Sequence, residues 1–498
     1  CALALNTYLG RDYMGSAGRF GNHLSHVVLA DENDMQNYPC EFYGSSLLRD
    51  HMEFEEVNNP NRPNFLPEPI LERGFTVDID AVIDFLSVDD RIEIYKNMLH
   101  AVLAFETERK RVVICDEPEN IIMWIAAIEY ALPLKIALSI NFSTYDFDPS
   151  LSASQICGVI PKGSRYTPES QRLHFVFDLY QNNCAEFEKD EHYFDFIDTS
   201  MSFSYDSLQD FHRFITNGYS YDKADERMYA AYRLYSLMSD GIDGLTEADI
   251  KTALEFANEY ANATEELRIL QVLFEQKDYL LRTDLNAFLC VMRYAVSKYE
   301  ILSEEYRAVI KSLMVDRVLY EFLNNTSGES SFVAFYDEVD SVCRLSGFSV
   351  ATELMRKSNR EKLFAVMQND ISNWKIAFIV RVVSTFVKDQ RVSVNDLLVD
   401  APLGQTYYGL VQAVYSRNAQ NGFFLVCDYL VNMALNIEGM LLDLPNGNQE
   451  VASMWKYFGQ CMVKYQQSNF GKAYSVLGSY QRYEQIYMLY SLAMSNAI

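Results

Sequence analysis

The chain has 498 residues, of which 42 are basic and 69 acidic, so its formal net charge is -27. This length exceeds what one hydrophobic core can serve, and a hydrophobic content of 49% predicts about two to four packed domains. The negative charge disfavours binding to nucleic acid and to anionic membranes, and it favours a basic protein partner.

Nine cysteines are scattered along the chain without a C-x-x-C pair, and their number is odd. This distribution predicts reduced thiols in a cytoplasmic protein. The sequence contains no run of 18 apolar residues and no basic-plus-apolar leader, so we expect no membrane association. The chain begins at Cys1 inside a strand-like run, which predicts that further residues precede it.

Residues 1–75 form the first predicted domain. Short apolar runs such as "CALAL" and "HVVLA" alternate with Gly, Asn and Pro turn signals. The proline-rich stretch "NNPNRPNFLPEP" closes this part. The pattern predicts a β-rich or mixed amino-terminal module with long loops.

Residues 76–222 form a predicted α/β middle domain. The run "RVVICDEP" is typical of a buried strand, and Pro118 fits the first turn of a helix over "ENIIMWIAAIEYAL" that ends before Pro133. Three further stretches, "KIALSINFSTY", "QICGVIP" and "RLHFVFDLY", are predicted as strands. A sheet with flanking helices follows from this alternation.

Residues 223–498 change to a helical pattern. Thr246, Thr264, Thr283 and Ser303 each precede an apolar-periodic run, as N-cap residues do. Helices joined by short turns pack antiparallel, which predicts a large all-α, solenoid-like helical array. Its many Tyr and Phe residues indicate core packing more than a partner-binding surface. The fold class of the whole chain is therefore predicted to be α+β.

Residues 15–30, "GSAGRFGNHLSHVVLA", contain a glycine-rich motif in which Gly15, Gly18 and Gly21 recur at three-residue intervals. A phosphate-binding loop needs a lysine after its glycines, and none follows here. The G-x-G-x-x-G spacing of dinucleotide sites is also absent. We therefore expect no nucleotide cofactor, and we interpret the glycines as a tight or left-handed turn.

Two histidines follow the glycines. His23 and His26 would point to opposite faces of the strand that the β-branched "HVV" favours, so they cannot readily share a metal ion. We expect His26 to anchor the strand beside Leu24 and Val28, with His26→Ala costing about 1–3 kcal/mol. No zinc-ligand spacing occurs elsewhere in the sequence, so no metal site is predicted.

An enzyme remains the alternative. The enzyme would be a hydrolase or a nuclease. Its site would contain Arg19, Asn22 and His23 together with an acidic residue of the middle domain. These side chains would have to converge in a pocket. All seven histidines lie within the first 212 residues, which confines acid–base chemistry to the first two domains. The acidic stretch 185–212, around His192 and His212, indicates a solvated face more than an oxygen-ligand metal site.

Two stretches together resemble bacterial GTPase-associated proteins. "YLGRDYMGSAGRFGNHLSHVVL" is similar to their G-R-x-G-N-x-x-x-H-V signature, and Arg19, Gly21, Asn22 and His26 carry the match. "VVICDEPENIIMWIAAIEYALPLKIALSINFSTYDFDPSLSASQICGVIP" is similar to the next segment of that family through its Trp, its "ALP", its "FSTY" and its "GVIP" ending. The resemblance covers residues 1–165.

Members of that family are encoded beside GTPases in multi-component bacterial conflict systems of the anti-phage type, where they resemble adaptors. The resemblance implies no catalytic residue and no cofactor. Our interpretation is a cytoplasmic adaptor or scaffold whose partner is a protein, such as a GTPase or an effector. The partner would bind within residues 223–498, through an acidic helical surface.

Overall fold

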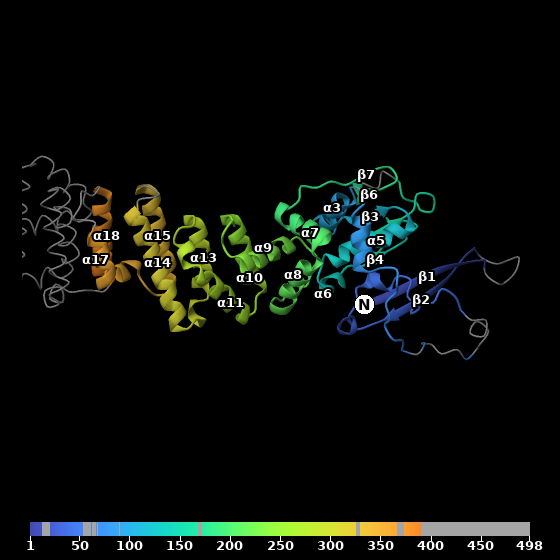
Figure 1. Ribbon diagram of the computed structural model, residues 1–498, viewed down its shortest axis with the longest axis horizontal. Helices are drawn as coiled ribbons and strands as arrows, with labels where there is room; N and C mark the ends of the chain where they lie inside the picture. The colour runs from blue at the N-terminus through green and yellow to red at the C-terminus, as the bar shows by residue number, and fades with distance from the viewer. Residues whose placement is uncertain are drawn as a thin grey trace, which may run out of the picture. The chain divides into compact units, whose positions relative to one another are not determined.

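The structure is a computed structural model. It describes residues 1–11, 20–52, 61, 66, 68–88, 90–167, 172–324, 329–365 and 373–389. The chain forms two compact units, Cys1–Glu275 and Gln276–Ile498. The predicted α+β class is confirmed, with strands in the first unit and helices in the described part of the second (Figure 1). The predicted domain limits after residues 75 and 222 stay predictions.

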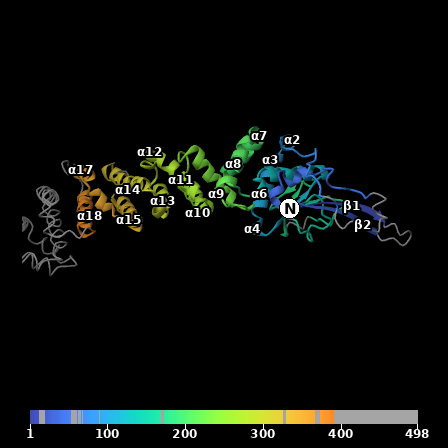
Figure 2. The same ribbon diagram turned by 90° about the horizontal axis from the view of Figure 1, so that it is seen from below.

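The chain opens with an antiparallel hairpin of β1 (Ala2–Arg11) and β2 (Phe20–Leu29), as Figure 2 shows. The strand expected around "HVVLA" is thus confirmed. Leu3 packs in a small core with Met35 and with Phe42 of the 3-10 helix η3 (Pro39–Phe42). The 3-10 helix η2 (Glu32–Asp34) precedes η3. Gly10 has a φ of 79°, which glycine adopts without steric cost, and the ladder is irregular beside it.

A five-stranded sheet has the order β4-β5-β3-β6-β7. Its strands are β3 (Arg111–Cys115), β4 (Phe142–Ser143), β5 (Ile156–Val159), β6 (His174–Asp178) and β7 (Asn183–Cys184). The first four strands in the order are parallel, and β7 is antiparallel to β6. β3, β5 and β6 confirm three predicted strands. Their almost continuous burial is typical of parallel sheets.

The strand predicted over "KIALSINFSTY" is wrong for most of its length. Its first part is the short helix α6 (Leu134–Ala137), with Pro133 at the N-cap, and only Phe142–Ser143 of the rest pairs, as β4. Ile136 and Ala137 are buried from within α6. Core packing of these apolar side chains therefore stabilises a helical turn where the residue types alone favoured a strand.

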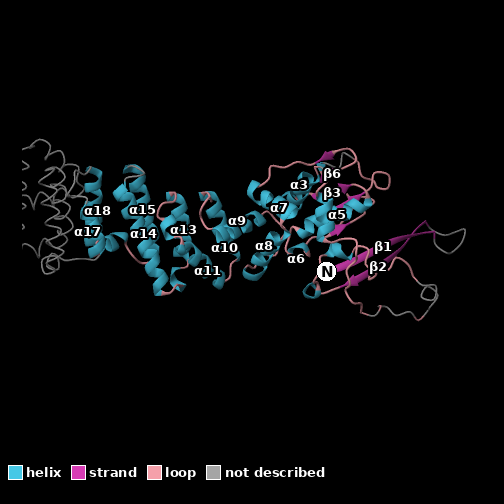
Figure 3. Cartoon of the chain, in the orientation of Figure 1, coloured by secondary structure: helices cyan, strands magenta, loops and turns pink. Residues whose placement is uncertain are grey.

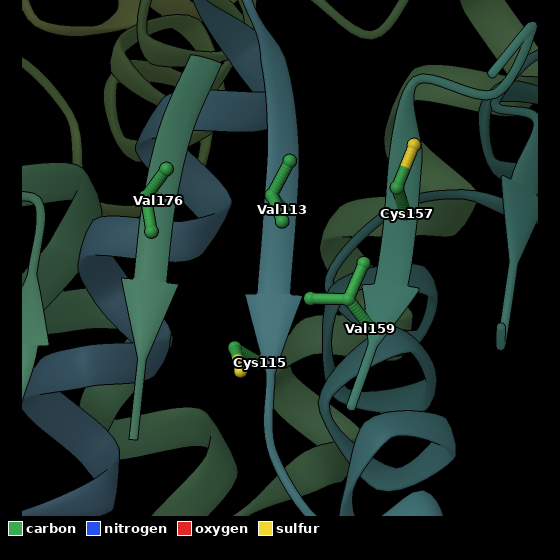
Figure 4. Close-up of a cluster of buried hydrophobic side chains, with 5 residues drawn as sticks. All are labelled: Val113, Cys115, Cys157, Val159 and Val176. Carbon is green, nitrogen blue, oxygen red and sulfur yellow. The ribbon is translucent and has the colours of Figure 1, made fainter. Parts of the chain in front are cut away.

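Helices α2 (Ile79–Leu86), α3 (Arg91–Leu103), α4 (Phe105–Glu108) and α5 (Pro118–Tyr130) complete the middle region. Pro118 occupies the first turn of α5, as predicted. A Cβ on Gly158 of β5 would lie 2.6 Å from Ile121 of α5, so this glycine permits the close approach of helix and sheet. The alternate residues of three strands form a separate cluster (Figure 4): Val113, Cys115, Cys157, Val159 and Val176.

Five helices end the first unit: α7 (Glu191–Phe203), α8 (Tyr205–Gly218), α9 (Arg227–Asp240), α10 (Glu247–Tyr260) and α11 (Ala263–Glu275). Arg233 of α9 links two of them, because its guanidinium lies 2.8 Å from Asp190 and 2.6 Å from Asp249. The aromatic side chains stack between helices; Phe196 and Tyr232, for example, have ring centroids 4.5 Å apart. Both rings are half-buried, so they pack between helices without reaching the fully buried core.

The described helices of the second unit lie side by side in chain order (Figure 3). They are α12 (Lys277–Leu280), α13 (Leu285–Ser297), η5 (Tyr299–Ile301), α14 (Glu304–Asn324), α15 (Glu329–Leu345), α16 (Val350–Leu354), α17 (Lys357–Ala365) and α18 (Asn373–Asp389). Within the described ranges, none of the helices has the length and apolarity needed to cross a membrane.

The four predicted N-caps are Thr246, Thr264, Thr283 and Ser303. Thr246 and Ser303 are confirmed, because each hydroxyl accepts a backbone N–H from the first turn of its helix. The other two are wrong by one or two positions: Asn262 caps α11, and Asp284 caps α13. The side-chain oxygens of Asn and Asp are N-cap acceptors at least as good as that of Thr, and these two lie at the helix starts.

Candidate functional site

The hairpin separates the two predicted histidines. His26 pairs with Leu5 and His23 pairs with Tyr8, so the two side chains lie on opposite faces of the ribbon. His23 is exposed, and its ring centroid lies 5.3 Å from that of Tyr8. His26 is half-buried on the face of Leu24. One metal ion therefore cannot bridge the pair in this geometry.

His26 accepts a hydrogen bond at Nδ1 from the backbone N–H of Arg49, at 3.1 Å. This bond ties the loop after β2 to the strand. We expect His26→Ala to lower the free energy of unfolding by about 1 kcal/mol, because the bond is partly exposed to solvent. Thermal melting of the full chain measures this, with the exposed His23→Ala as the matched control. Equal melting of the two variants would contradict an anchoring role.

The structure describes the other residues of the glycine-rich motif only in part. Gly15, Gly18 and Arg19 lie outside the described residues. Gly21 and Asn22 belong to β2 by their backbone, and Asn22 pairs with Gly10. The convergence of Arg19, Asn22 and His23 that an enzyme would require therefore stays a prediction.

Two carboxylates lie together where β3 and β6 end. Asp116 follows β3, and Asp178 ends β6 directly beside Cys115. The carboxyl ends of adjacent parallel strands are the usual ligand-binding edge of such sheets. Asp116 accepts the indole N–H of Trp124 at 2.8 Å, and Asp178 accepts the hydroxyl of Tyr166 at 3.1 Å. Both carboxylates are thus engaged in holding the domain together.

A third buried carboxyl group joins the amino-terminal module to α5. Glu129 has no exposed surface, and it accepts the backbone N–H of Cys40 at 2.8 Å. Burial, more than any neighbour, raises the pKa of Glu129 to about 8. Beside it, Glu41 accepts the hydroxyl of Tyr130 at 3.0 Å. We call these four residues the polar seam.

Asp116, Asp178 and Glu129 were not predicted from the sequence. The sequence did contain a signal for Asp116 and Asp178, because an acidic residue that ends or directly follows a buried strand lies at the ligand-binding edge of a parallel sheet. Glu129 had none, because a glutamate within an amphipathic helix usually faces water.

The acidic stretch 185–212 folds into α7, α8 and the loop before them. His192 is exposed, and His212 is buried with its Nε2 3.1 Å from the carbonyl oxygen of Ala131. Burial lowers the pKa of His212 to about 4, so this imidazole is neutral at pH 7. Among the described residues, no three His, Cys, Asp or Glu side chains are grouped so as to hold a metal ion.

The acidic residues are unevenly distributed among the helices. Residues 186–275 hold 20 acidic and seven basic residues, whereas residues 276–389 hold 15 of each. Within the predicted docking region 223–498, the acidic surplus is concentrated in residues 223–275, which hold 11 acidic and five basic residues; the docking role of this surface stays a prediction. Exposed carboxylates of residues 186–275 include those of Glu191, Asp195 and Asp243.

A pocket of about 360 Å³ opens between α13 and α15 in the second unit. Its lining is Arg293, Val296, Ser297, Glu338, Ser341, Val342 and Leu345. Arg293 and Glu338 form an ion pair at its rim. Leu345 is 82% exposed, whereas Val342 is buried. The pocket thus combines an aliphatic wall with a polar rim, which is the usual composition of sites that receive an apolar group.

Comparison with known proteins gives one family match. Residues 82–181 match the family described as GTPase-associated protein 1, middle domain. No curated protein and no solved structure matches the chain. The matched segment contains the sheet from β3 to β6, helix α5 and both edge carboxylates, Asp116 and Asp178. Residues 82–181 are therefore similar to the middle domain of GTPase-associated protein 1, and over that segment the resemblance to GTPase-associated proteins is confirmed.

Proposed function

We propose that this chain is a cytoplasmic adaptor of a GTPase-linked bacterial conflict system, and that it binds a protein partner through its carboxy-terminal helices. The pocket between α13 and α15 carries the proposal. Leu345 stands exposed at its mouth beside the buried Val342, so a partner's aliphatic side chain would gain apolar contact on entering. Such an anchor in a pocket is typical of the residues that dominate binding energy at protein interfaces.

Charge supports the same interpretation. The net charge of -27 attracts a basic partner to the chain over several ångströms, and ions in solution screen this attraction. The association rate should therefore fall as salt rises, while the dissociation rate, which depends on apolar contact in the pocket, should change much less. The alternative of a hydrolase or nuclease gains no support from His23, whose exposed ring lies against Tyr8.

The pocket predicts the effect of one substitution. Leu345→Glu should weaken binding to the GTPase that we propose as the partner at least tenfold, about 1.4 kcal/mol, because it puts a charge at the apolar mouth. Isothermal titration calorimetry with the full chain measures the dissociation constant. Ile301→Glu is the matched control, because Ile301 is also exposed, at 63%, and lies outside the pocket.

Two outcomes would contradict the docking assignment. Equal affinity of the Leu345→Glu and Ile301→Glu variants would remove the pocket from the interface. Full binding by a chain cut after Glu275, where the first compact unit ends, would assign the partner to that unit instead.

A further inference from the structure

Among the residues that the structure describes, no strand pairs with either outer edge of the β1–β2 hairpin. It forms a two-stranded sheet of its own, separate from the five-stranded sheet (Figure 3). In the part of the chain that the structure describes, no backbone hydrogen bond joins either strand to another element. An isolated two-stranded ribbon is marginally stable in water, and an open edge is a template for a further strand.

The hydrogen-bond pattern identifies which groups face outward. Cys1 and Ala30 exchange two backbone hydrogen bonds, of 2.9 and 3.1 Å, and so form a closely bonded pair. In an antiparallel ladder, hydrogen-bonded residue pairs alternate with non-hydrogen-bonded pairs. The residues of the non-hydrogen-bonded pairs direct their backbone N–H and C=O groups away from the partner strand, to the outer edges of the ribbon. On β1 the outward residues are therefore Ala2, Ala4, Asn6 and Tyr8.

The same residues share the exposed face of the ribbon, because side chains alternate along a strand. Ala2, Ala4 and Asn6 are exposed, and Tyr8 is 59% exposed. Opposite them on β2, Val27 is 51% exposed and Leu29 is 79% exposed. The small side chains of β1 leave room beside the larger ones of β2, where a bulky residue on an added strand could pack.

The hairpin lacks the charges that usually protect an open edge. Of the 20 residues in β1 and β2, Arg11 near the tip is the single Lys, Arg, Asp or Glu. Natural edge strands commonly carry lysine or proline, which oppose further pairing. On an added strand, a charged side chain would meet no oppositely charged side chain of β1 between Ala2 and Tyr8, so it would lose hydration without gaining a partner on that strand.

We propose that the β1 edge binds an extended, uncharged segment of another protein, which adds as a third strand beside Ala2 to Tyr8. Backbone hydrogen bonds to the outward groups would supply affinity, and alternating bulky side chains would pack over Ala2 and Ala4. A second copy of this chain fits less well, because each copy has a formal charge of -27. This surface is distinct from the pocket between α13 and α15 and does not depend on the function proposed for it.

Selection from a phage-displayed library of random decapeptides, with the full chain as bait, tests the proposal. We expect enrichment of uncharged peptides with apolar residues at alternate positions. Ala4→Pro should abolish their binding, because proline removes an outward N–H while the ladder to β2 keeps its own bonds. Ser25→Pro is the matched control, because it removes an outward N–H from the β2 edge, opposite Asn6, and leaves the β1 edge intact, so it should bind as well as the original chain.

A second measurement leaves the protein unchanged. A selected peptide can carry N-methyl groups on either of its two sets of alternate amides. Methylation of the set that bonds to β1 should abolish binding, and methylation of the other set should not. The unmodified peptide should slow amide hydrogen exchange at Ala4 and Asn6 at least tenfold. The proposal is overturned if no peptide family is enriched or if Ala4→Pro binds the peptides equally. It is also overturned if Ala4→Pro abolishes a concentration-dependent dimer of the chain, because the occupant would then be a second copy.

Discussion

Replacing Arg317 by alanine is expected to lower the free energy of unfolding of the α13–α14 region by about 3–5 kcal/mol, because it removes one partner of a buried ion pair. The side chains of Arg317 and Glu321 are each 3% exposed, and their charged atoms lie 3.0 Å apart. The guanidinium also donates to the carbonyl oxygens of Leu280 and Thr283, at 3.1 and 2.7 Å. It thereby holds α14 against the turn between α12 and α13.

Native-state hydrogen exchange of the α14 amides measures this loss, and it reports on one region of a chain with two compact units. Arg344→Ala is the matched control: Arg344 pairs with Asp340 and Asp389 but is 46% exposed, so its loss should cost about 0–1 kcal/mol. The double variant Arg317→Met with Glu321→Leu should regain most of the stability. Equal effects of Arg317→Ala and Arg344→Ala would contradict the role of the buried pair.

Glu129→Gln is expected to remove most of the pH dependence that the polar seam gives to stability. Burial raises the pKa of Glu129 from 4.5 to about 8 in the folded chain, so the folded state binds a proton more tightly than the unfolded state. Stability from this group is therefore complete below pH 4.5 and is lost as pH rises from 4.5 to 8. The loss by pH 7 is about 3 kcal/mol, since each unit of pKa difference is worth about 1.4 kcal/mol.

Thermal melting of the full chain between pH 5 and pH 8 measures this dependence. The melting temperature of the original chain should fall over that range, and that of the Glu129→Gln variant should fall less. The test is the slope of the melting temperature against pH, and not its absolute value. The new amide leaves a buried donor without an acceptor, which costs about 1–3 kcal/mol at every pH and so does not change the slope. Glu119→Gln, an exposed carboxyl group on the same helix, is the matched control. A Glu129→Gln slope equal to that of Glu119→Gln would contradict the assignment.

Local patterns in the sequence were sufficient to predict several elements. The strands β3, β5 and β6 were predicted because each is a short, nearly continuous apolar run between turn signals. The start of α5 followed from Pro118, and the start of α10 followed from Thr246, whose hydroxyl accepts the N–H three residues on. These features are local because each depends on residues within one or two turns of chain.

Other local predictions failed where neighbours in space decided the outcome. The residues of α6 read as a strand, but Ile136 and Ala137 reach the core from a helical turn. The bond that anchors His26 also depends on a distant segment, because the backbone N–H of Arg49 donates it. At α6, packing against the core outweighs a strand preference of less than about 1 kcal/mol per residue.

The sequence by itself determined the α+β class, the main buried strands and the change to helices after the sheet, because hydrophobic periodicity and capping are encoded within short stretches. Only the tertiary structure decided which distant residues meet. It brought Asp178 beside Cys115, seated Glu129 against Cys40 at a separation of 89 residues, and formed the pocket between α13 and α15. Such contacts depend on strand order and helix packing, and these follow from the burial of the whole chain, which no single stretch encodes.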